Sequence, residues 1–100
     1  MKTEEIVLIG KALSDKNRVD IIKLLSDGEL CACHILEHMK ITQPTLSHHM
    51  KQLTESGLVN VKKIGTWNHY SINKDTMDRY VEFLNDTHKP SDNSGICECK

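Results

Sequence analysis

The sequence has few aromatic residues: one Trp, two Tyr and one Phe in 100 residues. Its core must therefore be mainly aliphatic, although the apolar content of 38% is typical of a folded protein. No apolar run approaches the roughly 20 residues of a membrane span, because Ile6–Ile9 is short and follows two glutamates. We therefore expect a cytoplasmic protein with no signal peptide and no membrane partner.

Signatures of catalysis are also lacking. No nucleophile, base and orienting residue occur at a recognisable spacing, and no glycine-rich phosphate loop is present. We therefore do not expect an enzyme. A chain of 100 residues makes one small domain, or one protomer of an assembly that completes its core by pairing.

An overall excess of basic charge is missing as well, since the net charge is −1. The charge is unevenly distributed, however. Residues 40–70 contain four lysines and one glutamate, a net charge of +3, whereas the segments before and after them each have a net charge of −2. A local basic patch on a mildly acidic protein is typical of a surface that contacts phosphates.

Hydrophobic periodicity predicts helices over most of the chain. The third of them covers roughly residues 31–39, and the fourth ends before Gly57. Residues with short polar side chains mark where the other helices begin. These predicted caps are Thr3, Ser14 or Asp15, Thr42 and Asn73.

Between Gly57 and Asn73 the pattern alternates with period two, which predicts a β-hairpin with Gly65-Thr66 at its turn. The predicted fold is mainly α with a small β-hairpin, a winged helix-turn-helix. The first and last helices each keep an apolar stripe, so we expect them to form a homodimer interface. We expect residues 1–89 to form the DNA-binding and dimerisation domain, and residues 90–100 to form a flexible tail containing cysteines.

The fourth helix has an apolar stripe opposite a polar and basic face, a shape suited to the major groove of double-stranded DNA. His49 flanks the apolar stripe, so we interpret it as structural. The predicted DNA contacts are Gln43, Thr45, Ser47, His48, Lys51 and Gln52 on the helix and Lys62, Lys63, Thr66 and His69 on the hairpin.

The four cysteines form two tight pairs, Cys31/Cys33 and Cys97/Cys99, which we predict to be metal ligands or redox sensors. We expect a disulfide within either pair to need strained geometry. Residues i and i+2 of a helix point about 200° apart. Cys31 and Cys33 can therefore bind one ion only if the helix start is extended or unwound. His34 is a possible ligand for a borderline metal, although we favour a solvated role.

Three segments together resemble the ArsR/SmtB family of metal-responsive winged-helix repressors, over about positions 6–88. They are Asp15–Ile22, Glu29–Cys33, and Thr42–Leu53 followed by Gly57–Val59. The resemblance implies an apo homodimer that occupies operator DNA, needs no cofactor to do so, and leaves the DNA when an inducer binds.

Arsenite sensors of this family typically use three thiolates. Here His34 and Leu36 stand where many members have an Asp and a third Cys, so Cys97 or Cys99 of either chain would supply the missing ligand. The resemblance implies As(III) or Sb(III) as the inducer, with Cd(II) or Pb(II) as alternatives. A thiol redox or persulfide switch is another alternative. So is a thiol-rich metal carrier, although the polar helix face and basic hairpin argue against it.

Overall fold

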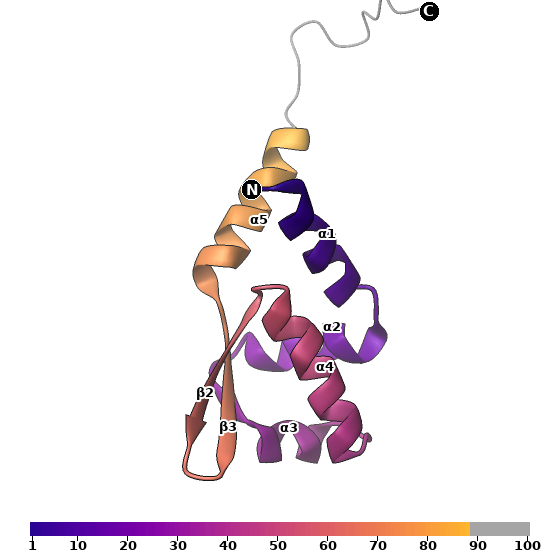
Figure 1. The fold of residues 1–100 in the computed structure, drawn as a ribbon, viewed down its shortest axis with the longest axis vertical. Helices are drawn as coiled ribbons and strands as arrows, with labels where there is room; N and C mark the ends of the chain where they lie inside the picture. The colour runs from indigo at the N-terminus through magenta and orange to yellow at the C-terminus, as the bar shows by residue number, and fades with distance from the viewer. Residues whose placement is uncertain (89–100) are drawn as a thin grey trace, which may run out of the picture.

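The computed structural model describes residues 1–88. Its elements, in chain order, are α1 (Thr3–Ala12), α2 (Lys16–Leu25), β1 (Leu30–Cys31), α3 (Ala32–His38), α4 (Gln43–Glu55), β2 (Val59–Ile64), β3 (Trp67–Ile72) and α5 (Lys74–Thr87). The predicted winged helix-turn-helix is confirmed (Figure 1). Strand β1, which was not predicted, extends the hairpin to an antiparallel sheet of order β1-β3-β2. Among these residues no helix has the length and apolar character needed to cross a membrane.

Side-chain caps define where three of the helices begin. The caps that accept backbone N–H groups are Thr42 for α4 and Asn73 for α5, as predicted, and Asp15 for α2, one of the two residues predicted there. The prediction that Thr3 caps α1 is wrong by one residue. The N-cap is Lys2, because the Glu5 carboxylate reaches back and accepts the Lys2 backbone N–H at 2.9 Å.

The core is built around α4, where the predicted stripe of Leu46, Met50 and Leu53 is buried. On α2 the buried residues are Ile21 and Leu25. Val19 and Ile22 of the same helix are only half-buried. Ile21 and Leu25 lie four residues apart, so they stand one above the other on the helix face that meets the core.

The molecule has two ends that are built from different elements. α1 and α5 lie together at one end, and the tip of the hairpin, α3 and the start of α4 lie at the other (Figure 1). An ion pair of 3.2 Å between Arg79 and Glu5 joins α5 to α1. Large apolar side chains stay 44–48% exposed on these two helices: Val7, Leu8, Val81 and Leu84. The described chain therefore leaves an apolar surface open at the end opposite the hairpin tip.

Candidate nucleic-acid interface and metal site

Helix α4 presents a polar face directly opposite its buried stripe. Its start is fixed by Thr42, whose hydroxyl accepts the backbone N–H of Thr45 at 3.3 Å. Five of the predicted DNA contacts on α4 are exposed, and the sixth, Gln52, is half-buried. The exposed ones are Gln43, Thr45, Ser47, His48 and Lys51. Hydroxyls, amides and a lysine on one exposed helix face are the groups that contact base edges and phosphates.

The hairpin β2–β3 forms the wing. Lys62, Lys63 and Thr66 are exposed near its turn, where Gly65 adopts a φ of +64°. Lys62 and His69 face each other across the two strands. His69 is half-buried, and its Nδ1 lies 3.4 Å from a carboxylate oxygen of Glu29. Lys62 Nζ also lies 3.4 Å from Glu29, so Lys62 and His69 share a partner within the protein, whereas Lys63 is exposed beside them.

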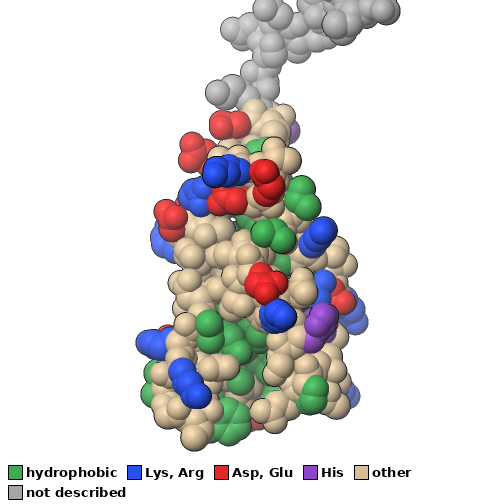
Figure 2. Space-filling model, in the orientation of Figure 1, with side chains coloured by type: hydrophobic (Ala, Val, Ile, Leu, Met, Phe, Trp, Pro, Cys, Tyr) green, Lys and Arg blue, Asp and Glu red, His purple; other side chains and the backbone are tan. Residues whose placement is uncertain are grey.

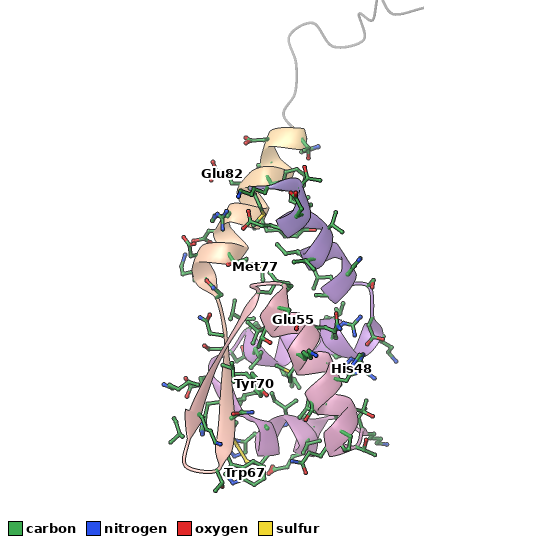
Figure 3. The ribbon with its side chains drawn as sticks, viewed as in Figure 1. His48, Glu55, Trp67, Tyr70, Met77 and Glu82 are labelled. Carbon is green, nitrogen blue, oxygen red and sulfur yellow. A yellow bond between two sulfur atoms is a disulfide. The ribbon has the colours of Figure 1, made fainter. Side chains whose placement is uncertain are left out.

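The surface between α4 and the wing is hollowed and partly apolar. Two open hollows of about 290 and 270 Å³ lie there, and Ser47, Asn68 and Tyr70 line both. Figure 2 shows hydrophobic side chains gathered between the hairpin and α4, with basic side chains on the hairpin beside them. Trp67, 45% exposed, lines the larger hollow near the tip of the wing (Figure 3). Helix α4 and the wing therefore border one continuous surface.

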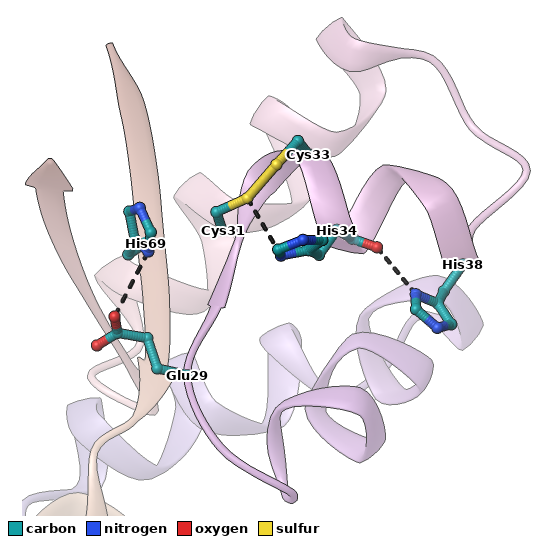
Figure 4. Close-up of a disulfide and its surroundings, with 6 residues drawn as sticks. All are labelled: Glu29, Cys31, Cys33, His34, His38 and His69. Carbon is teal, nitrogen blue, oxygen red and sulfur yellow. Dashed lines mark hydrogen bonds and ion pairs between the residues drawn. A yellow bond between two sulfur atoms is a disulfide. The ribbon is translucent and has the colours of Figure 1, made fainter. Parts of the chain in front are cut away.

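Cys31 and Cys33 lie at the junction of β1 and α3, and they are joined by a disulfide (Figure 4). Their Cα atoms are 5.4 Å apart, a separation that a disulfide can span. Cys31 is the N-cap of α3 and has an extended backbone, with φ −80° and ψ 159°. The helix start is therefore already extended, and no unwinding is needed to bring the sulfurs together.

His34 adds a third donor to this pair. Its Nδ1 lies 3.4 Å from Cys31 Sγ, and the donor atoms of Cys31, Cys33 and His34 all lie within 4.8 Å of one another. His34 is exposed, as predicted, but it also adjoins the sulfurs. The signal for this was its spacing, since three residues after an N-cap is one turn of the helix. The predicted ligands Cys97 and Cys99 lie outside the described residues.

His49 belongs to the interior of the domain, as its place beside the apolar stripe predicted. It is 6% exposed, and Arg18 donates from Nη1 to its Nδ1 over 3.1 Å. Burial lowers the pKa of His49, against the opposing effect of the nearby Asp15 carboxylate. Arg18 also donates from Nε to the backbone oxygen of Ala12 at 2.8 Å. His49 and Arg18 therefore hold α4 against the end of α1.

Similarity to known proteins agrees with this geometry. The family described as bacterial regulatory protein, arsR family, matches residues 15–61. The arsenical resistance operon repressor of Staphylococcus aureus is 47% identical over 85% of this chain and 82% of its own. The repressor of the same name from Staphylococcus xylosus is 45% identical over 100% of this chain and 93% of its own.

A solved structure gives the same result for the fold. It is the homodimeric winged helix-turn-helix DNA-binding domain of a possible ArsR-family transcriptional regulator from Mycobacterium bovis. It is 28% identical to this chain, with a TM-score of 0.70, and the match covers 85% of this chain and 82% of that one.

Proposed function

The chain belongs to the arsR family of bacterial regulatory proteins, and from this premise we propose that it is a metalloid-responsive transcriptional repressor. In this proposal a homodimer without inducer binds double-stranded operator DNA and dissociates when arsenite or antimonite binds cysteine thiolates. Both Staphylococcus relatives are named as repressors, so we assign no catalytic activity. We also propose a cytoplasmic location, because operator DNA is there.

The exposed polar face of α4 and the lysines of the wing support the DNA-binding part. Thr45, Ser47 and Lys51 project from a helix whose other face is fixed in the core, so their positions are held before DNA arrives. Lys62 and Lys63 extend the positive charge beyond the helix. We propose that the helix reads bases in the major groove while the wing lysines contact phosphates.

The open apolar surface on α1 and α5 supports the homodimer. Val7 and Leu8 on α1, and Val81 and Leu84 on α5, would be removed from water by a second copy. A two-fold axis there would direct two copies of α4 towards successive major grooves and select a pseudo-palindromic site. We propose residues 1–89 as this domain and residues 90–100 as a separate tail.

The observation that carries the inducer assignment is the position of the two sulfurs. Cys31 and Cys33 lie on one side of the β1–α3 junction, close enough to bond to each other and so to one soft atom. Thiolates are the ligands that a trivalent metalloid takes from a protein. We propose that both cysteines, once reduced, bind As(III) or Sb(III), and that Cys97 or Cys99 is available to add a thiolate.

The wing is the route by which this binding would reach DNA. Cys31 pairs with His69 in the sheet, and the Glu29 carboxylate lies 3.4 Å from Lys62 Nζ and 3.4 Å from His69 Nδ1. A ligand that pulls on Cys31 would therefore shift the strand that holds the wing. A coupling of about 1 to 3 kcal/mol would change operator affinity roughly 5- to 150-fold.

The disulfide between Cys31 and Cys33 favours a second candidate, a thiol redox switch. In that case the two thiols would give two electrons and two protons to an oxidant such as hydrogen peroxide, which becomes two water molecules. Cadmium or lead bound by the same thiolates is an alternative inducer of the same repressor.

Fluorescence anisotropy of labelled promoter DNA tests the proposal. The fully reduced protein is bound to the DNA without oxygen, and arsenite, antimonite, cadmium, lead or hydrogen peroxide is then titrated. We expect release by equimolar arsenite or antimonite, and no release from the Cys31→Ser variant. Release by cadmium or lead alone would make that divalent ion the inducer in place of the metalloid. Release by peroxide alone would establish the redox switch.

The control for DNA binding is a pair of lysine substitutions. Lys51→Ala is expected to weaken DNA binding and reduce the salt slope by about one, since it removes one phosphate contact. Lys23→Ala, at an exposed position of α2, is expected to leave both unchanged. Equal binding by the two variants would contradict the assigned interface.

A further inference from the structure

The imidazole of His34 is a third possible metal ligand beside the two sulfurs, in addition to the cysteine pair. It comes from the first turn of α3 and points towards Cys31, with Nδ1 3.4 Å from Sγ (Figure 4). The neighbouring His38 on the same helix points elsewhere, because its Nδ1 lies 2.9 Å from the backbone oxygen of His34. Of these two exposed histidines on α3, only His34 shares a site with the sulfurs.

The separation between Cys31 Sγ and His34 Nδ1 suits a common metal ion. With metal–sulfur and metal–nitrogen bonds of about 2.3 and 2.0 Å, two ligands of a tetrahedral ion lie about 3.5 Å apart. The observed 3.4 Å, in the form that holds the Cys31–Cys33 disulfide, is close to this value. The same bond lengths place two sulfur ligands about 3.8 Å apart, a separation that Cys31 and Cys33 can adopt once their bond is reduced.

The burial of the three donors suits an ion that enters from solvent. Cys31 is 6% exposed, Cys33 is half-buried and His34 is exposed, so the group is closed on the protein side and open on the other. Three protein ligands with one open position is an arrangement that tetrahedral ions use when they keep a water molecule.

We propose that His34 completes, with Cys31 and Cys33, a site of two thiolates and one imidazole for a tetrahedral divalent cation of the Zn(II) or Cd(II) class. This inference rests on the proposed function in that it uses the same two cysteines. It extends that function because imidazole is a good ligand for borderline divalent ions, whereas the metalloid needs thiolates alone. The β1–α3 junction would thus bind either a trivalent metalloid or a divalent cation, and only the affinity for the divalent cation would depend on His34.

Co(II), whose thiolate complexes absorb in the near ultraviolet, is the probe for this site. The full chain is reduced with a phosphine and titrated without oxygen, as wild type, His34→Gln and His38→Gln. We expect His34→Gln to weaken Co(II) binding at least about 100-fold, since loss of an outer-shell partner alone costs about 10- to 100-fold. His38→Gln, a matched change on the same helix, is expected to bind Co(II) like the wild type.

A Cys97→Ser/Cys99→Ser variant separates His34 from the other possible third ligands. If the tail cysteines complete the site, this variant loses the Co(II) absorption and His34→Gln keeps it, which overturns the proposal. Equal Co(II) affinity of His34→Gln and wild type overturns it as well. His34 is exposed, so His34→Gln is expected to fold normally, and circular dichroism checks this.

Release of DNA distinguishes this proposal from the proposed function. We expect His34→Gln to lose release by Zn(II) or Cd(II) and to keep release by arsenite within about twofold, because the thiolates are intact. If arsenite releases neither protein, the metalloid assignment fails while the Co(II) result still decides the role of His34. If arsenite and divalent release are lost together in His34→Gln, the division between the two ligand classes is wrong.

Discussion

Helices α4 and α5 have similar lengths and starts but opposite relations to the core. They contain 13 and 14 residues, and each begins at a side-chain cap, Thr42 or Asn73. α4 buries four residues, whereas α5 buries none within the described protomer. Met77 and Tyr80 of α5 are half-buried against the core. The rest of its apolar stripe faces outwards.

This difference separates two tasks. α4 gains its stability from its own protomer, so the orientation of the DNA-reading face is fixed before any partner arrives. The exposed apolar stripe of α5 adds no stability from burial until another surface covers it. Under the proposed function its contribution to stability therefore depends on a second copy. Substitutions in the two helices should therefore differ in whether their effects depend on protein concentration.

The largest expected effect follows from truncating the buried side of α4. Leu53 is 0% exposed, so Leu53→Ala should lower the free energy of unfolding by about 2 to 5 kcal/mol through lost burial and a residual cavity. Urea denaturation followed by circular dichroism measures this loss, which should change little with protein concentration.

The matched substitution on α5 is Leu84→Ala, since Leu84 is 44% exposed. At concentrations where the chain is monomeric it should change the free energy of unfolding by no more than about 0.5 kcal/mol. A loss as large as that of Leu53→Ala under those conditions would show that α5 belongs to the protomer core.

Placing a charge on the outer stripe of α5 is expected to have a smaller effect than Leu53→Ala, and on the dimer instead of the protomer. Leu84→Glu should weaken the dimer by roughly 1 to 3 kcal/mol, because the carboxylate must lose water when a second copy covers it. Sedimentation equilibrium measures the dimer, and DNA affinity should fall with it. Asn85→Glu adds the same charge at the next exposed position and is the control. Equal weakening by both variants would point to general charge repulsion instead of an interface at Leu84.

Features of these helices that depend on neighbouring residues could be predicted from the sequence. The caps Asp15, Thr42 and Asn73 and the stripe of α4 could be predicted because each rests on local spacing or on a local hydrogen bond. β1 could not, because a strand of two residues has no period and exists only through pairing with β3.

The thiol site was predicted in part for the same reason. The cysteines themselves are visible in the sequence, but the extended backbone of Cys31 comes from the pairing of β1, and that backbone brings Cys33 beside it. The link between Glu29 and the wing is likewise a contact between distant segments, which joins Glu29 to Lys62 and His69. Local patterns could not predict either feature.

The smallest expected effect is on the pH dependence of stability, and it comes from His49, the polar residue on the buried face of α4. Arg18 has only donors to offer, so the Nδ1 that it contacts must carry a lone pair, and protonation of Nδ1 would break this contact. The pKa of His49 lies below its ordinary value of 6.5, mainly because the side chain is buried and also because of the Arg18 charge. The Asp15 carboxylate raises this pKa, but by less than the other two effects lower it. Between the two pKa values the unfolded chain therefore binds more protons than the folded one.

Stability should consequently be greatest above the ordinary pKa of 6.5 and should fall as the pH is lowered from there towards the depressed pKa of the folded state. His49→Gln retains an amide oxygen that can accept from Arg18 but does not titrate, so its stability should vary less over this pH range. His48→Gln changes the exposed neighbour in the same helix and should keep the wild-type slope. Urea denaturation at a series of pH values measures the three slopes. If the stability of His49→Gln varied with pH as steeply as that of the wild type, the pH dependence would have to come from groups outside the buried face of α4.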